Sequence, residues 1–402
     1  MRKRVILFLL VVLVVSIFGY GVGHSLGEEK ETALKNLDIL GEGIATIEDK
    51  YVEKQKLKDI IYGAMKGALA SLDSYSQFLT PDDYKNLIVE TEGKFGGLGI
   101  EITIRDSVLT IISPIEDTPA WEAGIEPGDI IVEIDGESTK DITLNEAVKK
   151  LRGEPGTKVT LTVLHPNQRE VSEIEITRGI IKIEDIKNSS ILEDDIGYVK
   201  IAEFRESTAK DLERALADLK KKKLAGLILD MRNNPGGLLS SAVDVSSLFL
   251  KKGLEIVSID SRNQEKVVYK SDSFSPKLIE IPVVVLINKG SASGSEIVAA
   301  ALRDNNRAVL IGETTFGKGS VQTIIPLSDG SAMRLTTSRY YTPAGISIHE
   351  KGIKPDIVVV KKEVTEKEDI FEKLKKEKNF EYKKDYQLIR ALDLMKGLLV
   401  LQ

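Results

Sequence analysis

Two short, almost entirely apolar runs limit what this chain can fold into. Gly226–Asp230 and Val283–Ile287 together contain a single charged residue, at the end of the first run. Strands of this kind are buried on both faces, which is typical of a parallel sheet covered by helices. Segments with helical spacing alternate with them, at Ser207–Lys221 and Ala242–Leu250. The alternation continues through residues 181–360 and predicts an α/β core.

Before this core, the hydrophobic period changes to two. Between residues 93 and 180, β-branched runs such as Ile130–Ile134 and Val159–Val163 are separated by Gly-rich turns. Two short helices fit Ala120–Ala123 and Leu144–Leu151. This pattern predicts a compact, mostly β domain inserted before the core.

The segments on either side of these domains carry helical patterns. Apolar residues recur at three- and four-residue spacing within residues 26–92. Residues 361–402 are rich in Lys and Glu and place Leu388, Leu392 and Met395 at helical spacing. We expect a helical arm and a helical tail, which pack on the body or form homodimer contacts.

The N-terminus predicts the location of the protein. Arg2, Lys3 and Arg4 precede an apolar run from Val5 to Phe18, the pattern of a basic region followed by a hydrophobic one. Because no clear A-x-A cleavage site follows, we favour an uncleaved membrane anchor at residues 1–25. A cleaved signal peptide is the close alternative. Both place the body outside the cytoplasm, with the positive end inside.

Composition excludes several functions. The chain has no cysteine, which removes disulfide frameworks, thiolate zinc sites and cysteine nucleophiles. It has three histidines, one of them His24 beside the anchor, so we expect no multi-histidine metal site and no cofactor. The formal net charge is -6, and the longest basic run is Lys220–Lys223. This balance argues against nucleic acid as a partner.

A candidate nucleophile follows the second apolar run. Gly290–Glu296 is a Gly- and Ser-rich turn that leads into an Ala-rich segment. Ser293 and Glu296 match a capping box, which is a purely structural reading. A Ser at a sharp strand-to-helix turn can also project its hydroxyl into a cleft. The Gly294 amide and the helix N-terminus would then face developing negative charge, as in an oxyanion hole.

A serine nucleophile needs a base, and Lys318 is the candidate. Neither His165 nor His349 lies in a recognisable triad motif. Lys318 stands in the loop Gly317–Ser320, and a lysine can act as a base where burial lowers its pKa toward neutrality. Gln322 could hydrogen-bond the neutral amine and orient it. A lysine on a surface loop is the plain alternative.

The same residues also match a nucleotide-binding motif. Gly312–Lys318 fits G-x-x-x-x-G-K after an apolar strand. Gly319, however, stands where a Mg-binding Ser or Thr belongs. The only strand that resembles a Walker B, the one ending at Asp230, comes before the motif, and little α/β sequence follows it. We therefore do not expect nucleotide binding.

Five segments together resemble the carboxyl-terminal processing peptidases, also called tail-specific proteases. In chain order they are Leu229–Leu238, Gly290–Ile297, Phe316–Gln322, Tyr340–Gly345 and Gly352–Ile357. The resemblance extends over nearly the whole chain after the expected anchor. It implies a serine endopeptidase whose α/β core is similar to the crotonase and Clp folds.

The resemblance also assigns roles to single residues. It makes Ser293 the nucleophile, Lys318 the general base and Gln322 the residue that orients the base. The implied oxyanion hole consists of three backbone amides, those of Gly236, Gly237 and Gly294. The family usually has Ala in place of Gly294, but the backbone amide is the same in both.

Residues 93–180 independently resemble a PDZ domain. The implied carboxylate-binding loop is Phe95, Gly96, Gly97, Leu98, Gly99 and Ile100, where small residues let backbone amides face a C-terminal carboxylate. The following strand would pair with the peptide by β-augmentation. Arg152 would couple the PDZ domain to the protease, with a plain helix-end cation as the alternative.

We therefore expect an extracytoplasmic serine endopeptidase that cleaves proteins recognised through their C-termini. Two alternatives remain. A catalytically silent PDZ adaptor is disfavoured by the intact Ser293, Lys318 and Gln322. An acyl-CoA enzyme of the crotonase type is disfavoured by the PDZ segment and the export signal. An inserted PDZ domain could also block the cleft until a substrate tail binds.

Overall fold

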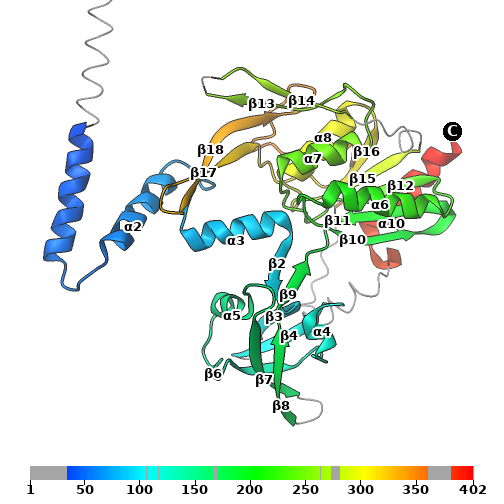
Figure 1. Ribbon diagram of the computed structural model, residues 1–402. Coiled ribbons are helices and arrows are strands. Elements are labelled where there is room, and N and C mark those ends of the chain that lie inside the picture. Colours follow the sequence, from blue (N-terminus) through cyan, green and yellow to red (C-terminus); the bar gives the residue numbers. More distant parts are fainter. Residues whose placement is uncertain are drawn as a thin grey trace, which may run out of the picture. The chain divides into compact units, whose positions relative to one another are not determined.

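The computed structural model describes residues 34–401 apart from several gaps (Figure 1). The gaps are residues 106, 116, 166–169, 263, 273–280 and 361–381. The expected anchor, residues 1–25, lies outside the described residues. Among the helices that the structure describes, none is long and apolar enough to cross a bilayer.

The chain divides into two compact units. The first contains the described residues up to Thr80 together with Ile324–Leu335. The second contains Pro81–Thr323 and Thr336–Gln402. Residues 324–335, which the sequence places within the protease core, thus group with the N-terminal arm.

The first unit is the predicted helical arm with a strand pair at its end. Residues 34–50 are helical, and α2 (Leu57–Ala70) follows. The strand β1 (Gln77–Leu79) pairs antiparallel with the start of β18 (Ala332–Tyr341). The ring of Tyr62 on α2 lies 4.7 Å from the ring of Phe78 on β1, so helix and strand share one small core.

The predicted mostly β domain is confirmed. Its sheet has the order β3-β4-β5-β7-β8, and β6 pairs with β5. The strands are β3 (Ile100–Arg105), β4 (Val108–Pro114), β5 (Ile130–Ile134), β6 (Glu137–Ser138), β7 (Lys158–His165) and β8 (Glu170–Thr177). The two expected helices are α4 (Pro119–Glu122) and α5 (Leu144–Leu151). Aliphatic side chains such as Leu109, Ile131 and Leu161 are fully buried between them.

A two-stranded ribbon carries both ends of this domain. The helix α3 (Pro81–Glu92) leads into β2 (Lys94–Gly97), which pairs antiparallel with β9 (Gly179–Lys182). Gly97 and Gly179 are opposite each other in this pairing. The chain therefore enters and leaves the β domain at one place, as an insertion requires.

The predicted α/β core is a six-stranded sheet with the order β10-β11-β12-β15-β16-β19. All of its pairs are parallel except the edge pair β10–β11. The strands are β10 (Ile186–Ile191), β11 (Ile196–Ile201), β12 (Gly226–Asp230), β15 (Val283–Ile287), β16 (Ala308–Gly312) and β19 (Ile357–Val358). The two apolar runs form the central strands β12 and β15, and every residue in them is buried.

Helices cover both faces of this sheet (Figure 1). Alternate strand residues such as Leu227 and Leu229 pack with α6 (Thr208–Lys220), α7 (Leu239–Ser247) and α8 (Gly294–Asp304). The residues between them, such as Ile228, pack with α10 (Tyr386–Val400). The helix expected at Ala242–Leu250 begins earlier, because the N-cap Leu238 directly follows the positive-φ residues Gly236 and Gly237.

The structure also contains an antiparallel sheet that the predicted α/β alternation did not include. It joins β13 (Glu255–Ser261) to β14 (Val267–Lys270) and to β18, and β18 also pairs with β17 (Ser320–Pro326). The sequence pattern did not predict these strands. Most residues of β17 and β18 are half-buried, so these strands show no clear alternation of buried and exposed side chains.

Candidate active site

Ser293 occupies a strained turn between β15 and α8. Its φ of 52° and ψ of -112° lie in a region that non-glycine residues rarely adopt. Such strain costs about 1–3 kcal/mol and is concentrated at functional sites. The residue is 8 % exposed. The backbone thus holds this one side chain at the point where a buried strand turns into a helix.

The neighbouring hydroxyl groups are already engaged. Ser291 Oγ donates to the carbonyl of Met231 (2.8 Å), and Ser295 Oγ donates to the carbonyl of Asn234 (2.9 Å). Both side chains are fully buried. Ser293 therefore stays the predicted nucleophile among the three serines of this turn.

The Gly236–Gly237 pair lies directly against this turn. A Cβ atom added to Gly236 would be 2.7 Å from Ser293 Cβ and 2.8 Å from Gly294 N. A Cβ atom at Gly237 would be 2.0 Å from the carbonyl oxygen of Phe204. Only glycine fits at these positions. The fold therefore brings together the three predicted oxyanion residues, although the Gly236 amide donates to Asn234 Oδ1 (2.9 Å).

Glu296 connects the nucleophile turn to the loop of Lys318. Its Oε2 accepts hydrogen bonds from the amides of Ser293 (2.8 Å) and Lys318 (2.9 Å). Its Oε1 accepts from the Gly317 amide (2.7 Å) and Thr315 Oγ1 (2.5 Å). Burial raises the pKa of the Glu296 carboxyl more than these four hydrogen bonds lower it. The sequence pattern indicated only the local capping contact, so it missed this connection.

Lys318 is half-buried in a loop whose backbone is fixed from both sides. The Gly317 carbonyl accepts from the Glu350 amide (2.9 Å), and the Gly319 carbonyl accepts from the Tyr340 amide (2.8 Å). A Cβ atom at Gly319 would be 2.2 Å from the backbone nitrogen of His349. These contacts fix the backbone conformation of the loop. The Lys318 amide therefore lies beside the Glu296 side chain, which also binds the Ser293 amide.

Gln322 lies on β17, just after this loop. Its Nε2 donates to Ser320 Oγ (2.8 Å) and more weakly to Thr336 Oγ1 (3.4 Å). Ser320 is 3 % exposed. The side-chain amide is thus held in place four residues after Lys318 in the chain, and its role in orienting the base stays a prediction.

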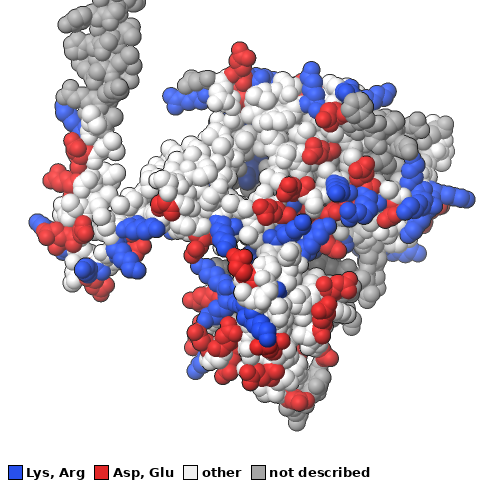
Figure 2. All heavy atoms as spheres, viewed as in Figure 1, with Lys and Arg blue, Asp and Glu red and all other residues white. Residues whose placement is uncertain are grey.

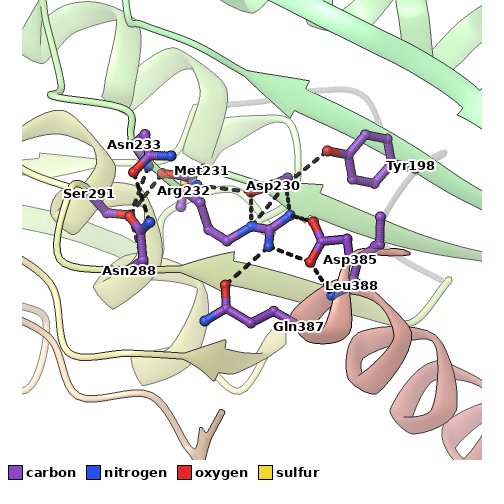
Figure 3. A network of polar contacts seen from close by, with 10 residues as sticks. All are labelled: Tyr198, Asp230, Met231, Arg232, Asn233, Asn288, Ser291, Asp385, Gln387 and Leu388. Carbon is purple, nitrogen blue, oxygen red and sulfur yellow. Dashed lines mark hydrogen bonds and ion pairs between the residues drawn. The ribbon is translucent and has the colours of Figure 1, made fainter. Parts of the chain in front are cut away.

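A polar loop after β12 supports the nucleophile turn (Figure 3). Asn288 Oδ1 accepts from the amides of Asn233 (2.9 Å) and Gly290 (3.0 Å), and Asn288 Nδ2 donates to Asn233 Oδ1 (2.9 Å). The Asn234 carbonyl accepts from the amide of Ala292 (3.0 Å). Sequence reasoning assigned no role to these asparagines. Asn233 and Asn234 lie in the family-like segment Leu229–Leu238, which could have indicated one, whereas Asn288 lies just before the segment Gly290–Ile297.

The predicted carboxylate-binding loop falls in two parts. Phe95 to Gly97 belong to the ribbon strand β2, where Gly96 packs against the Gly153 carbonyl. Leu98 and Gly99 form the turn into the edge strand β3, and Gly99 has a φ of 78°. The carbonyl of Leu98 accepts from the Ala120 amide (2.9 Å). The turn that precedes the edge strand is thus fixed in place by α4.

Comparison with known proteins decides the family. Residues 195–359 match Peptidase family S41, and residues 110–164 match the PDZ domain. A carboxy-terminal-processing protease of Bartonella bacilliformis is 45 % identical over 334 residues, which cover 82 % of this chain and 76 % of that protein. This chain belongs to the carboxy-terminal processing proteases of family S41. It is a serine peptidase with a PDZ domain, as predicted.

Two further matches are informative, one for the family and one for the fold. The carboxy-terminal processing protease CtpA of Bacillus subtilis is 37 % identical over 367 residues, covering 89 % of this chain and 78 % of that protein. A solved structure described as an S41 protease from Bacteroides fragilis has a TM-score of 0.52 at 18 % identity. It covers 87 % of this chain and 92 % of the other, and it supports the fold alone.

Arg152 of the processing protease caps the C-terminal end of α5. Its guanidinium carbon lies 4.3 Å from the ring centre of Phe95 on the ribbon strand β2. A cation–π contact of this kind contributes about 0.5–1 kcal/mol where it is exposed. The contact joins a helix of the PDZ domain to its connecting ribbon, while the coupling role stays a prediction.

Proposed function

We propose that this enzyme is an endopeptidase that cleaves proteins with a Ser293–Lys318 dyad. The observation that carries the proposal is the Glu296 carboxylate, which binds the backbone of both residues. A base and a nucleophile must stand within hydrogen-bond reach during the reaction. A shared buried anchor keeps the two loops in one arrangement without a histidine.

In the proposed reaction, Ser293 Oγ attacks the carbonyl carbon of the scissile bond. Lys318 in its neutral form takes the hydroxyl proton and then gives it to the leaving amine, so that an acyl-enzyme remains. Water, deprotonated by the same lysine, attacks the acyl-enzyme, and the lysine returns the proton to Ser293 Oγ as the acid product leaves. Since the Gly236 amide already donates to Asn234, we assign the oxyanion hole to the Gly237 and Gly294 amides.

Substrate selection is proposed to take place in the PDZ domain. The strand β3 is the edge of its sheet, and α5 packs beside it. An extended peptide can add to such an edge while its terminal carboxylate meets the amides of the Leu98–Ile100 turn. We propose that the C-terminal tail of a substrate protein binds there.

Location and partners follow from the N-terminal sequence. We propose that residues 1–25 anchor the enzyme in a membrane, with its body on the extracytoplasmic side. The helix at residues 34–50 exposes apolar side chains, among them Leu34, Leu37 and Leu40, and is the candidate for homodimer contacts. On the face shown in Figure 2, acidic and basic side chains are interspersed, unlike a surface that binds nucleic acid.

The test is cleavage of an unstructured protein by the full-length enzyme. We expect Ser293→Ala and Lys318→Ala to abolish cleavage while peptide binding to the PDZ domain persists. Lys289→Ala, at an exposed lysine on the same turn, is the matched control and should stay active. Activity in Ser293→Ala would move the nucleophile elsewhere. Peptide binding without cleavage by the parent enzyme would favour the silent PDZ adaptor.

A further inference from the structure

The N-cap residue of the C-terminal helix α10, Asp385, also forms an ion pair with Arg232. Asp385 Oδ1 accepts a hydrogen bond from the Leu388 amide (3.1 Å). The same carboxylate binds Arg232 at both oxygens, Nη1 to Oδ1 at 2.9 Å and Nη2 to Oδ2 at 2.6 Å (Figure 3). This paired geometry is the strongest form of an Arg–carboxylate contact.

Arg232 is half-buried and belongs to a network of polar contacts that ends in the central sheet. Its Nε lies 3.0 and 3.1 Å from the two oxygens of Asp230, which is 1 % exposed and also accepts from Tyr198 Oη (2.8 Å). Burial alone would raise the pKa of Asp385, but the hydrogen bond and charge of Arg232 hold it below its ordinary value. The ion pair therefore stays charged at neutral pH.

Arg232 also belongs to the loop that supports the nucleophile. Residues 231–236 follow β12 directly, and Ser291 Oγ donates to the Met231 carbonyl (2.8 Å). The next residue, Asn233, exchanges two hydrogen bonds with Asn288. A guanidinium that is fixed by Asp385 therefore fixes the backbone on which the turn of Ser293 rests.

We propose that Asp385 is a positioning residue for catalysis. Through Arg232 it holds residues 231–236 in the path that the oxyanion amides and Ser293 need. The helix α10 is then part of the frame of the active site, although it lies far from Ser293 in sequence. This proposal rests on the function proposed above for Ser293 and Lys318.

Apolar packing holds the helix α10 on the sheet independently of the ion pair. Leu388, Leu392 and Met395 are buried against the sheet. A Cβ atom at Gly226 would be only 2.5 Å from Met395 Sδ, so the helix packs closely on the central strand β12. The positioning role of Asp385 can therefore be separated from the covering role of α10.

The test uses Asp385→Asn in the full-length enzyme. Asn is as good an N-cap as Asp, so this change removes the charge that binds Arg232 and keeps the helix start. The control is Asp393→Asn on the same helix, where an exposed carboxylate pairs with Arg390. We expect kcat of Asp385→Asn to fall roughly 10- to 100-fold, as expected for a small misplacement of reacting groups, with KM within about twofold.

A second measurement is the rate at which a fluorophosphonate probe labels Ser293, a reaction that requires no peptide bound to the PDZ domain. This rate should fall together with kcat in Asp385→Asn and stay unchanged in Asp393→Asn. Arg232→Lys alone should also lower kcat. In the double variant Asp385→Asn/Arg232→Lys, the loss in kcat should be smaller than the product of the two single losses, because both substitutions disrupt the same contact. Circular dichroism checks that each variant is folded.

Two outcomes would overturn the proposal: unchanged kcat and labelling in a folded Asp385→Asn, or an equal loss in Asp393→Asn. If Asn disturbs the fold, Asp385→Glu keeps the charge, and its kcat must then stay close to that of the parent. Failure of the proposed function is distinguishable, because then the parent enzyme would be no more active than Ser293→Ala.

Discussion

Single glycines and one carboxylate determine the geometry around Ser293. Gly236 leaves no room for a side chain, and Glu296 holds the nucleophile turn and the base loop with four hydrogen bonds. Three of these four hydrogen bonds come from backbone amides, and Gly236 lies against the backbone and the Cβ atom of Ser293. Substitutions at either position should therefore change catalysis by moving the backbone.

Gly236→Ala should lose at least about 100-fold in kcat/KM, because its Cβ atom would push on Ser293 Cβ and displace the reacting hydroxyl. Gly253→Ala is the matched control. Gly253 also has a positive φ, 89° against 104° for Gly236, but its added Cβ atom would meet nothing within 4 Å. Both variants carry similar backbone strain, so equal losses of activity would contradict the steric argument.

Glu296→Gln should change how stability depends on pH. Because the pKa of Glu296 is raised in the folded state, this carboxyl binds its proton more tightly there than in the unfolded chain. Its contribution to the free energy of unfolding is full below about pH 4.3 and is lost as the pH rises through the folded pKa. The parent-minus-variant difference, measured by urea unfolding, should fall as the pH rises above about 4.3. A constant difference would contradict the prediction.

At the scale of elements, the sequence predicted those strands that have a clear hydrophobic pattern of their own. The apolar runs became β12 and β15 with the expected bounds, because burial on both faces leaves a continuous signal. The strands β17 and β18 were not predicted, since half-buried polar residues give no clear period.

Contacts between distant parts of the chain were also invisible to the pattern. Glu296 shows a local capping signal, whereas its bonds to Gly317 and Lys318 depend on how the two loops meet. Likewise, nothing near Asp385 indicates that its partner is Arg232. Such contacts appear only when the tertiary structure is known.

The stability of the helix α5 should depend on Arg178, a residue near the C-terminal end of the PDZ domain. Its guanidinium donates to the carbonyls of Lys150 (2.8 Å) and Leu151 (3.0 Å) at the end of the helix, and to that of Lys158 (2.9 Å). Arg178→Ala should destabilise the PDZ domain by about 3 kcal/mol, because buried carbonyls lose charged donors. Faster hydrogen exchange at Leu144–Leu151 measures this loss.

Arg152→Ala is the control for Arg178→Ala, since it also removes an arginine at the end of α5. Arg152 contacts the Phe95 ring and is only partly buried, so its loss should cost about 1 kcal/mol or less. If the two variants exchange at the same rate, the hydrogen bonds of Arg178 do not stabilise the helix.

At the scale of the whole molecule, the ribbon of β2 and β9 connects the PDZ domain to the rest of the chain. Gly97 and Gly179 are opposite each other, so a two-residue Asn-Gly turn can join them and remove residues 98–178 without disturbing either strand. If the PDZ domain selects substrates and blocks the cleft until a tail binds, this shortened enzyme should cleave proteins with free and amidated C-termini at equal rates. The parent should prefer the free carboxylate.

The same shortened enzyme separates gating from selection. Labelling of Ser293 by a fluorophosphonate reports the state of the catalytic centre and should be faster than in the unliganded parent if the PDZ domain restrains it. Slower labelling would instead mean that the PDZ domain supports the active arrangement, and equal labelling would leave it with substrate capture only. A retained preference for free C-termini would contradict recognition by the PDZ domain and place it in the protease core.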